Sequence, residues 1–270
     1  MSDRRWTTTL SDVDRNLLWH DAGQYRWHAA DGIRAALREF LLDNLRTMGF
    51  AHVHNLADVT SPGVQVPPGF TFLLRQIGRI VEQNGDGMLT QVLRDNGGDG
   101  MTELDYQCDT SDLLALLCLQ PAADGGGKTK LVSGRTVVDM LRAERPDVLH
   151  TLTTQDFFFD RRGRAGPQII VRPIFTLLPD GAVDVYYHSR TVRDTPSTYG
   201  PPLTIIQREA IAVLDEILKR PGTGYGLPMQ AGDLLVIRNS RVMHGRSPYI
   251  DVPGALSRRM LRIWMDTHEL

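Results

Sequence analysis

The sequence contains few cysteines: Cys108 and Cys118 are the only two in a chain of 270 residues. Small secreted domains that depend on disulfides use several pairs, so we expect neither that class of protein nor a bond between these two thiols. A hydrophobic leader is missing as well, because residues 1–10 are largely polar, and no apolar run approaches the length of a membrane span. These absences predict a cytoplasmic protein with no membrane partner.

An excess of charge of one sign is also missing. The 30 lysines and arginines nearly balance the 32 aspartates and glutamates, which leaves a net charge of −2. A nucleic-acid-binding domain or a polybasic membrane patch would show a basic excess, so we expect no nucleic-acid partner. The length allows one large domain or two small ones with a sizeable core.

Hydrophobic residues at helical spacing, together with capping and stop signals, predict several helices. Thr204 is the expected N-cap of the longest one in the second half of the chain. A segment rich in glycine, asparagine and aspartate, residues 84–100, is predicted to be a mobile loop. The predicted helices are Asp31–Met48, Phe70–Glu82, Arg135–Arg145, Pro146–Thr153 and Thr204–Lys219.

Short apolar or alternating runs between turn signals predict strands, most of them in the second half of the chain. The predicted strands are Phe50–His54, Leu113–Leu119, Thr129–Ser133, Ile169–Leu178, Val183–His188, Asp233–Arg238 and Arg258–Met265. Many strands with a few inserted helices favour a jelly roll that carries helical additions.

Two histidines alternate along the strand Phe50–His54, so His52 and His54 fall on one face. This spacing resembles a pair of metal ligands. Polar positions on a half-buried strand give the same pattern, and we adopt that interpretation.

The strand near the C-terminus places two arginines on one face. Alternation puts Arg258, Met260, Arg262 and Trp264 on the same side. A buried guanidinium needs an anionic partner, and a dicarboxylate ligand suits an arginine fork. A core acid that pairs with Arg262 is the structural alternative.

Taken together, the motifs resemble the TauD/TfdA family of oxygenases over about Asp105 to Trp264, with a weaker match before it. The family's pattern is a His-x-Asp pair, an apolar strand and a Gly-Gly-x-Thr stretch. The matching residues are Asp109, Leu116–Leu119, Gly125-Gly126, Thr129, Arg145-Pro146-Asp147, Asp160–Gly163 and Gly232-Asp233. Their order and spacing carry the resemblance.

The resemblance implies an α+β fold, a double-stranded β-helix (jelly roll) core with flanking and inserted helices. It implies a single domain over residues 1–270, with a helix-rich part and substrate loops in 1–100 and the jelly-roll core in 101–270. The cofactors implied are Fe(II) and 2-oxoglutarate, held by a triad of two histidines and a carboxylate that leaves open positions on the metal. Carried over by position, Asp109 is the carboxylate and His244 the distal histidine.

The same carry-over assigns three further residues. Thr129 and Arg258 resemble the groups that hold the far carboxylate of 2-oxoglutarate, and Arg262 resembles a second arginine near the keto acid or the substrate. We therefore expect Asp109 and His244 to converge at the mouth of the jelly roll. Arg258 is expected in the same cavity, with Thr129 beside it.

Gln107 stands where the family has its first metal-ligating histidine. An amide oxygen is a weak ligand for iron(II), whereas imidazole is a good one. Three alternatives follow. Gln107 ligates the metal through its amide oxygen, or water fills the ligand position. Another histidine, such as His188, takes the place of the missing imidazole, or the site no longer binds a metal. An engineered replacement of histidine by glutamine at position 107 would give the same sequence. Cys108, beside it, is expected to point into the core.

These observations leave two hypotheses. The first is an enzyme that converts 2-oxoglutarate to succinate while it oxidises a small-molecule substrate. The second is a redirected or non-catalytic relative that uses the pocket for binding, or an oxidase with another metal and no 2-oxoglutarate. No substrate motif is found in residues 54–69 or 84–100, and Tyr187, Arg190 and Arg193 are interpreted as residues of a solvated face.

Overall fold

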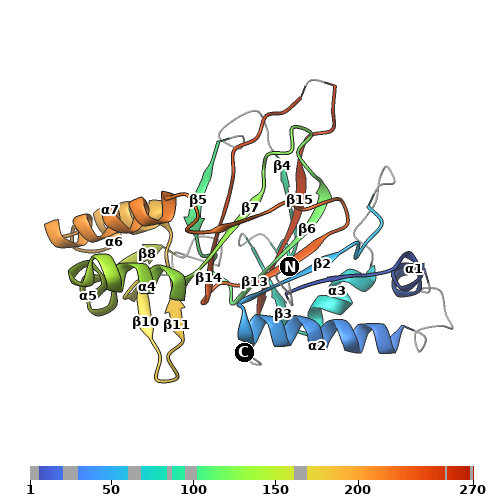
Figure 1. Ribbon diagram of the computed structural model, residues 1–270, viewed down its shortest axis with the longest axis horizontal. Coiled ribbons are helices and arrows are strands. Elements are labelled where there is room, and N and C mark those ends of the chain that lie inside the picture. The colour runs from blue at the N-terminus through green and yellow to red at the C-terminus, as the bar shows by residue number, and fades with distance from the viewer. Residues whose placement is uncertain are drawn as a thin grey trace.

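The computed structural model describes residues 6–20, 30–59, 68–83, 87–94, 102–160, 169–252, 254–267 and 270. In these parts of the chain, two β-sheets pack face to face at the centre, and helices cover the outside (Figure 1). The predicted α+β jelly-roll class is confirmed. None of the helices in the described ranges is long and apolar enough to span a membrane.

The larger sheet has seven strands in the described part of the chain. Its path runs β1-β2-β13-β6-β15-β3, and β4 also pairs with β15. The pairs along this path are antiparallel except for β1 with β2. The strands are β1 (Thr7–Thr9), β2 (Phe50–His54), β13 (Leu234–Arg238), β6 (Leu113–Gln120), β15 (Arg259–Asp266), β3 (Arg79–Val81) and β4 (Gln91–Arg94).

The smaller sheet has the order β12-β7-β14-β5, with every neighbouring pair antiparallel. It consists of β12 (Tyr225–Leu227), β7 (Thr129–Ser133), β14 (Val242–Arg246) and β5 (Leu104–Gln107). A hydrophobic cluster between the sheets joins side chains from both, among them Leu116 and Trp264 from the larger sheet and Leu131 from the smaller one. This cluster is the interior of the jelly roll.

Helices α1 (Asp12–His20), α2 (Asp31–Thr47) and α3 (Pro68–Arg75) belong to the N-terminal third. The outer face of the larger sheet packs against α2 and α3 through a second cluster that includes Leu41, Phe70 and Ile263. Arg258, Met260, Arg262 and Trp264 were predicted to share one face of their strand. Met260 and Trp264 do lie in the interior cluster, whereas Leu261, Ile263 and Met265 lie in the outer one.

The remaining helices form a separate layer at one end of the molecule, together with two hairpins (Figure 1). Thr204 caps the longest of these helices through a capping box with Gln207, as predicted. The elements of this layer are α4 (Gly134–Glu144), α5 (Pro146–Thr154), α6 (Ser189–Tyr199), α7 (Ile205–Lys219), β8 (Phe157–Asp160), β9 (Ile169–Arg172), β10 (Phe175–Leu177) and β11 (Val183–Val185).

Several predicted boundaries were wrong. The predicted helix 70–82 stops at Arg75 and is followed by β3, and strand β4 lies inside the predicted loop 84–100, of which 84–86 and 95–100 lie outside the described residues. The predicted strand 169–178 is divided into β9 and β10, with Pro173 between them, because proline has no N–H to donate to a ladder. Residues 161–163 of the family-like motif also lie outside the described ranges.

Candidate metal centre and active-site cavity

Asp109 and His244 come together at the end of the smaller sheet, as predicted. His244 lies in β14 and Asp109 follows β5, and the Nε2 atom of His244 is 3.8 Å from Oδ1 of Asp109. Both side chains are buried. This distance is longer than a hydrogen bond, and the buried Nδ1 atom of His244 has no hydrogen-bond partner among the described residues. The imidazole of His244 therefore lies next to the carboxylate of Asp109 without a hydrogen bond between the two groups.

Two contacts hold Asp109, one at its carboxylate and one at its backbone. The indole N–H of Trp264 donates to Oδ2 over 2.7 Å, and the backbone N–H of Asp109 donates to Oδ1 of Asn239 over 3.1 Å. Asn239 in turn donates its amide to the Ser111 carbonyl. The sequence interpretation gave no role to Trp264 or Asn239. The only signal was that Trp264 shares a strand face with Arg262.

Gln107 occupies the position beside these two residues. It pairs directly with His244 across the β5–β14 ladder, and on its other side it forms an isolated antiparallel bridge with His188. Directly opposite residues in an antiparallel pair point to the same side of the sheet. His244, Gln107 and His188 therefore stand in a row on one face, and Asp109 lies close by.

A cavity of about 260 Å³ opens beside this row. Arg262, predicted from its strand face, lines it, and the guanidinium is held by the side-chain oxygens of Gln83 (2.9 Å) and Gln91 (2.5 Å) rather than by a core acid. The described residues that line the cavity are Gln107, Cys108, Asp109, Thr110, Asp160, His188, Arg190, Thr191, Arg262 and Trp264.

Burial favours the neutral form of His244, beside Asp109, and of His188, which lines the cavity. It lowers the pKa of His244, while Asp109 raises it and Arg262 lowers it further. The pKa of His188 is also lowered by burial, against an opposing effect from Asp109. Neutral imidazole is the form that binds a metal ion. Both rings are therefore in the ligating state near neutral pH.

Arg258 and Thr129 are buried, but they do not share the cavity of Asp109. Arg258 lines a separate cavity of about 90 Å³, and Thr129 donates to Sδ of Met229, which lines the same small cavity. The expectation of one common cavity was wrong. Met260, between Arg258 and Arg262 in the sequence, is buried and lines the smaller cavity together with Arg258.

The glycine turn before β7 explains how Arg258 is buried. Gly127 has a φ of +63°, and a Cβ atom there would come within 2.9 Å of Cδ and Nε of Arg258. The guanidinium also lies over the ring of Tyr249, 5.7 Å from its centroid. The family-like glycine stretch therefore provides the close approach that this arginine requires.

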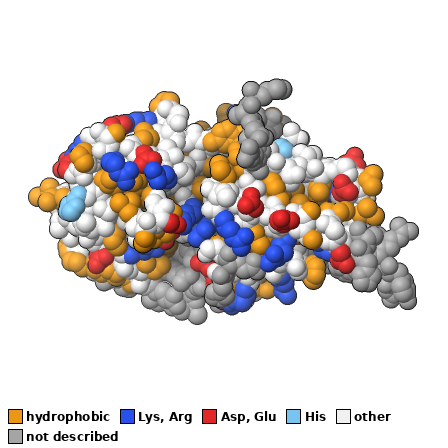
Figure 2. Space-filling view, turned by 60° about the horizontal axis from the view of Figure 1, so that its bottom comes forward, with side chains coloured by type: hydrophobic (Ala, Val, Ile, Leu, Met, Phe, Trp, Pro, Cys, Tyr) orange, Lys and Arg blue, Asp and Glu red, His pale blue; other side chains and the backbone are white. Residues whose placement is uncertain are grey.

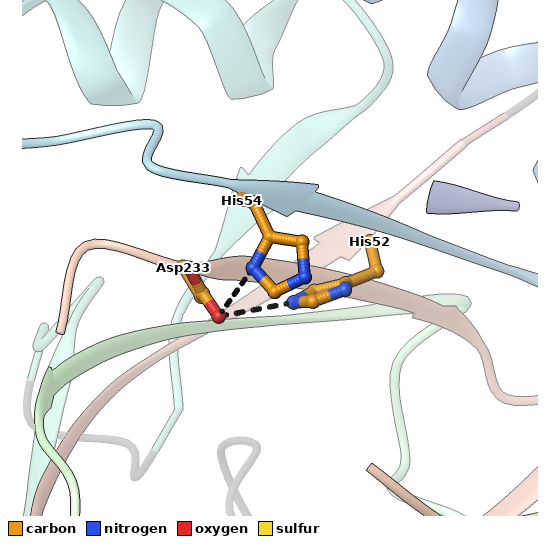
Figure 3. A group of neighbouring side chains, drawn as sticks. All are labelled: His52, His54 and Asp233. Atoms are coloured by element: carbon orange, nitrogen blue, oxygen red, sulfur yellow. Dashed lines mark ion pairs between the residues drawn. The ribbon is translucent and has the colours of Figure 1, made fainter. Parts of the chain in front are cut away.

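A different group has the composition of a metal triad. His52, His54 and Asp233 bring one ligating atom each to within 4.8 Å of one another (Figure 3). Nε2 of His52 and Nδ1 of His54 lie 3.3 and 3.0 Å from Oδ2 of Asp233. The structure thus shows a His-His-Asp group here rather than a glutamine-containing one. The interpretation of the two histidines as plain polar positions was wrong, because it did not include Asp233 at the start of the neighbouring strand.

Asp233 already has several partners within the protein. Its carboxylate accepts hydrogen bonds from the backbone N–H groups of Asn55 and Gln230. Burial alone would raise the pKa of Asp233, but the adjacent imidazole of His52, the hydrogen bonds from these N–H groups and the nearby His54 lower it overall. His52 is also in contact with the hydroxyl of Thr7. The group therefore ties β1, β2 and β13 together.

The two centres are far apart. Asp233 precedes β13, and Asn239, which holds the backbone of Asp109, follows it six positions later (239 − 233). At about 3.3 Å per strand residue, the backbones of Asp233 and Asn239 lie roughly 20 Å apart at opposite ends of β13. One metal ion cannot bind both.

Three residues that were interpreted as a solvated face have different environments. Tyr187 is fully buried, and its hydroxyl donates to Asp215 over 2.5 Å; burial and this carboxylate raise its pKa. Arg193 pairs with the same carboxylate. Arg190 is exposed and lines the cavity of Asp109.

Cys108 and Cys118 are free and buried, as expected. Figure 2 shows one face of the molecule, on which lysines and arginines lie interspersed with acidic and apolar side chains.

Comparison with known proteins now places the chain in a class. Residues 29–264 match the profile of the taurine catabolism dioxygenase TauD, TfdA family. The chain belongs to this family, which confirms the resemblance seen in the sequence.

Relatives and solved structures agree with this assignment. FR-33289 synthase of Streptomyces rubellomurinus is 26% identical over 207 residues, which cover 70% of this chain and 60% of that protein. A taurine hydroxylase-like protein of Stachybotrys chartarum is 31% identical over 163 residues, covering 58% and 40%. The chain thus matches less than two thirds of the length of either. An asparagine oxygenase structure with Fe(II), hydroxyasparagine and succinate has a TM-score of 0.71 at 18% identity, over 96% of this chain and 93% of that one.

Proposed function

We propose that this chain is an iron(II)- and 2-oxoglutarate-dependent oxygenase that oxidises a small molecule at the Asp109–His244 cavity. The observation that carries this proposal is the convergence of Asp109 and His244, which lie 135 positions apart in the chain (244 − 109), beside a cavity that Asp109 and Arg262 line. The composition of the site fits the family: a neutral imidazole with an unsaturated nitrogen, a carboxylate fixed by Trp264, and a cationic side chain for an anionic cosubstrate.

The residues of this site would act in defined ways. Asp109 and His244 would hold iron(II), which supplies the oxidising chemistry when bound with 2-oxoglutarate and O₂. Trp264 keeps one oxygen of Asp109 engaged and leaves the other directed toward His244. Arg262 would bind the keto acid or the substrate, and Thr129 with Arg258 the far carboxylate of 2-oxoglutarate.

The substrate is proposed as a small molecule with polar groups. Structural neighbours of the chain include an asparagine oxygenase and an oxygenase, OrfP, in complex with hydroxyarginine. The cavity here offers Arg190 near its opening and Arg262 deeper inside. These cations suit a substrate that carries a carboxylate or another anionic group.

His52, His54 and Asp233 are a second candidate metal centre, supported by their donor set and by the buried Nε2 of His52, which lacks a hydrogen-bond partner. The hydrogen bonds already made by Asp233 support a structural role instead. None of these three residues lines the cavity beside Asp109.

Anaerobic iron(II) titration followed by succinate measurement tests the proposal. The wild type is expected to bind one iron beside the cavity and, once O₂ is admitted, to convert 2-oxoglutarate to succinate and CO₂. His244→Ala should abolish both, and His54→Ala should preserve both. Loss of iron in His54→Ala with retention in His244→Ala would move the metal to the second centre and overturn the proposal.

A further inference from the structure

The metal site lacks one strong ligand at position 107. A neutral amide oxygen binds iron(II) weakly compared with imidazole. Asp109 and His244 alone supply one oxygen and one nitrogen ligand. The described residues around the cavity include one further imidazole, that of His188.

We propose that His188 supplies the imidazole that Gln107 lacks, so that the metal centre consists of Asp109, His188 and His244. This inference rests on the proposed function and identifies a ligand from outside the usual chain positions. The bridge between Gln107 and His188 places His188 directly beside Gln107, on the side away from His244. Since paired residues point to the same side of a sheet, the side chains of His188 and His244 lie on one face. Neighbouring strands lie about 4.8 Å apart, and the side chain of a histidine is long enough for its ring to cover that distance.

The backbone at His188 is firmly held. Its carbonyl accepts the N–H of Val192 in the first turn of α6, and the N–H of Cys108 donates to the neighbouring Tyr187 carbonyl over 2.6 Å. The imidazole itself is half-buried and lines the cavity next to Asp109. A fixed backbone with a side chain in the cavity is the arrangement that a positioned ligand needs.

The ring has little to lose when it turns toward the metal. Among the described residues, the ring has one polar contact, from the backbone N–H of Thr191 to Nδ1 over 3.5 Å. Ordinary N–H hydrogen bonds are about 2.7–3.2 Å long. Rotation of the ring therefore gives up one weak contact and gains a metal bond.

Four variants of the full chain separate the ligands: His188→Ala, Gln107→Ala, the double variant Gln107→His/His188→Ala, and the control His150→Ala, which removes an exposed histidine of α5. All are made in the His54→Ala background, which disables the second candidate centre. Iron(II) affinity is measured by anaerobic titration. Coordinated imidazoles are counted by electron spin echo spectroscopy with Cu(II) as the probe, and near-UV circular dichroism reports folding.

Loss of a group that orients a metal ligand without binding the metal typically weakens metal affinity by roughly 10–100-fold. We expect His188→Ala to weaken iron(II) binding by more than this. The imidazole count should fall from two to one. The double variant should restore both, because it returns a histidine to the strand position, while Gln107→Ala and His150→Ala should keep two imidazoles.

Other results overturn the inference in recognisable ways. An unchanged imidazole count in folded His188→Ala would exclude His188 as a ligand, and a large loss of affinity in Gln107→Ala alone would assign the ligand to the amide. If the background protein binds no iron, or His244→Ala does not weaken binding, the proposed function itself fails at this cavity.

Discussion

The indole of Trp264 holds the carboxylate of Asp109 from a strand 155 positions further along the chain, with a 2.7 Å hydrogen bond between two buried groups. The contact leaves the other oxygen of Asp109 facing His244. It also places the ring of Trp264 4.4 Å below the guanidinium of Arg262. One side chain therefore orients both a proposed metal ligand and a proposed anion-binding group.

Trp264→Phe should keep the interior packed and remove the hydrogen bond. Groups that orient a metal ligand typically contribute 10–100-fold to metal affinity, so we expect iron(II) binding to weaken by about that factor. Anaerobic titration measures the effect. Trp6→Phe is the matched control, since Trp6 packs on Phe50 and Tyr225 instead. Equal affinities in the wild type and Trp264→Phe would show that Asp109 is not a ligand, or does not need this support.

The glycine turn provides a test of the Arg258 assignment. Gly125 and Gly127 both have positive φ, so alanine strains the backbone at either position. Only at Gly127 does the added Cβ meet Arg258, whereas nothing lies within 4 Å at Gly125. We expect Gly127→Ala to weaken 2-oxoglutarate binding about 10–100-fold, the equivalent of one charged hydrogen bond, and Gly125→Ala to leave it unchanged.

Calorimetry on the two alanine variants, with Arg258→Ala as a reference, gives the comparison. Arg258→Ala should weaken 2-oxoglutarate binding to a similar extent and lower the melting temperature little. Full affinity in Arg258→Ala would remove this arginine from the cosubstrate site and leave Arg262, which lines the larger cavity, as the anchor.

The sequence was sufficient where the pattern was long. The eight-residue strand β6 is a continuous apolar run that was predicted as a buried strand, and the two faces of β15 were assigned correctly from their alternation. The capping box of α7 is likewise local, since Thr204 and Gln207 contact each other directly. These features depend on neighbours in the chain, and sequence reasoning has access to those.

Short strands were missed because tertiary pairing decides them. Strands β3 and β4 have three and four residues and no detectable hydrophobic period. Gln83 follows β3 and Gln91 begins β4, and both side chains accept hydrogen bonds from Arg262. A Cβ atom at Gly78 would come within 2.8 Å of the Asp266 carbonyl oxygen, so glycine at this position lets β3 lie against β15. The cluster of His52 and His54 with Asp233 was missed for the same reason. Its members meet across a ladder between distant segments.

The two cysteines should be inert in the folded protein. Burial raises the pKa of Cys108 and of Cys118 to about 12. The thiolate is the reactive form, so at pH 8 almost none is present. Iodoacetamide should modify neither residue in the native protein and both after unfolding in guanidinium, as read by mass spectrometry. Rapid alkylation of one cysteine without unfolding would contradict the buried placement.

Asp233 should contribute to stability in a way that depends on pH. Its folded-state pKa is lower than the ordinary value near 3.8, so its stabilising effect is complete above that value and is lost as the pH falls through the folded pKa. Asp233→Asn removes the charge while it retains the size of the side chain. We expect it to cost about 1.5–3 kcal/mol at pH 7, the usual contribution of hydrogen bonds to a charged group.

Urea unfolding at pH 7 and at a pH below the lowered, folded-state pKa of Asp233 gives the comparison, with Asp156→Asn as an exposed control. The difference between the wild type and Asp233→Asn should shrink in acid, because the wild-type carboxylate then becomes neutral as well. Added Zn²⁺ distinguishes the structural role from the metal-binding one. A rise in wild-type stability that Asp233→Asn and His54→Ala both abolish would show that this group binds a metal. An identical response in all three proteins would leave it as the hydrogen-bonded tie between β2 and β13.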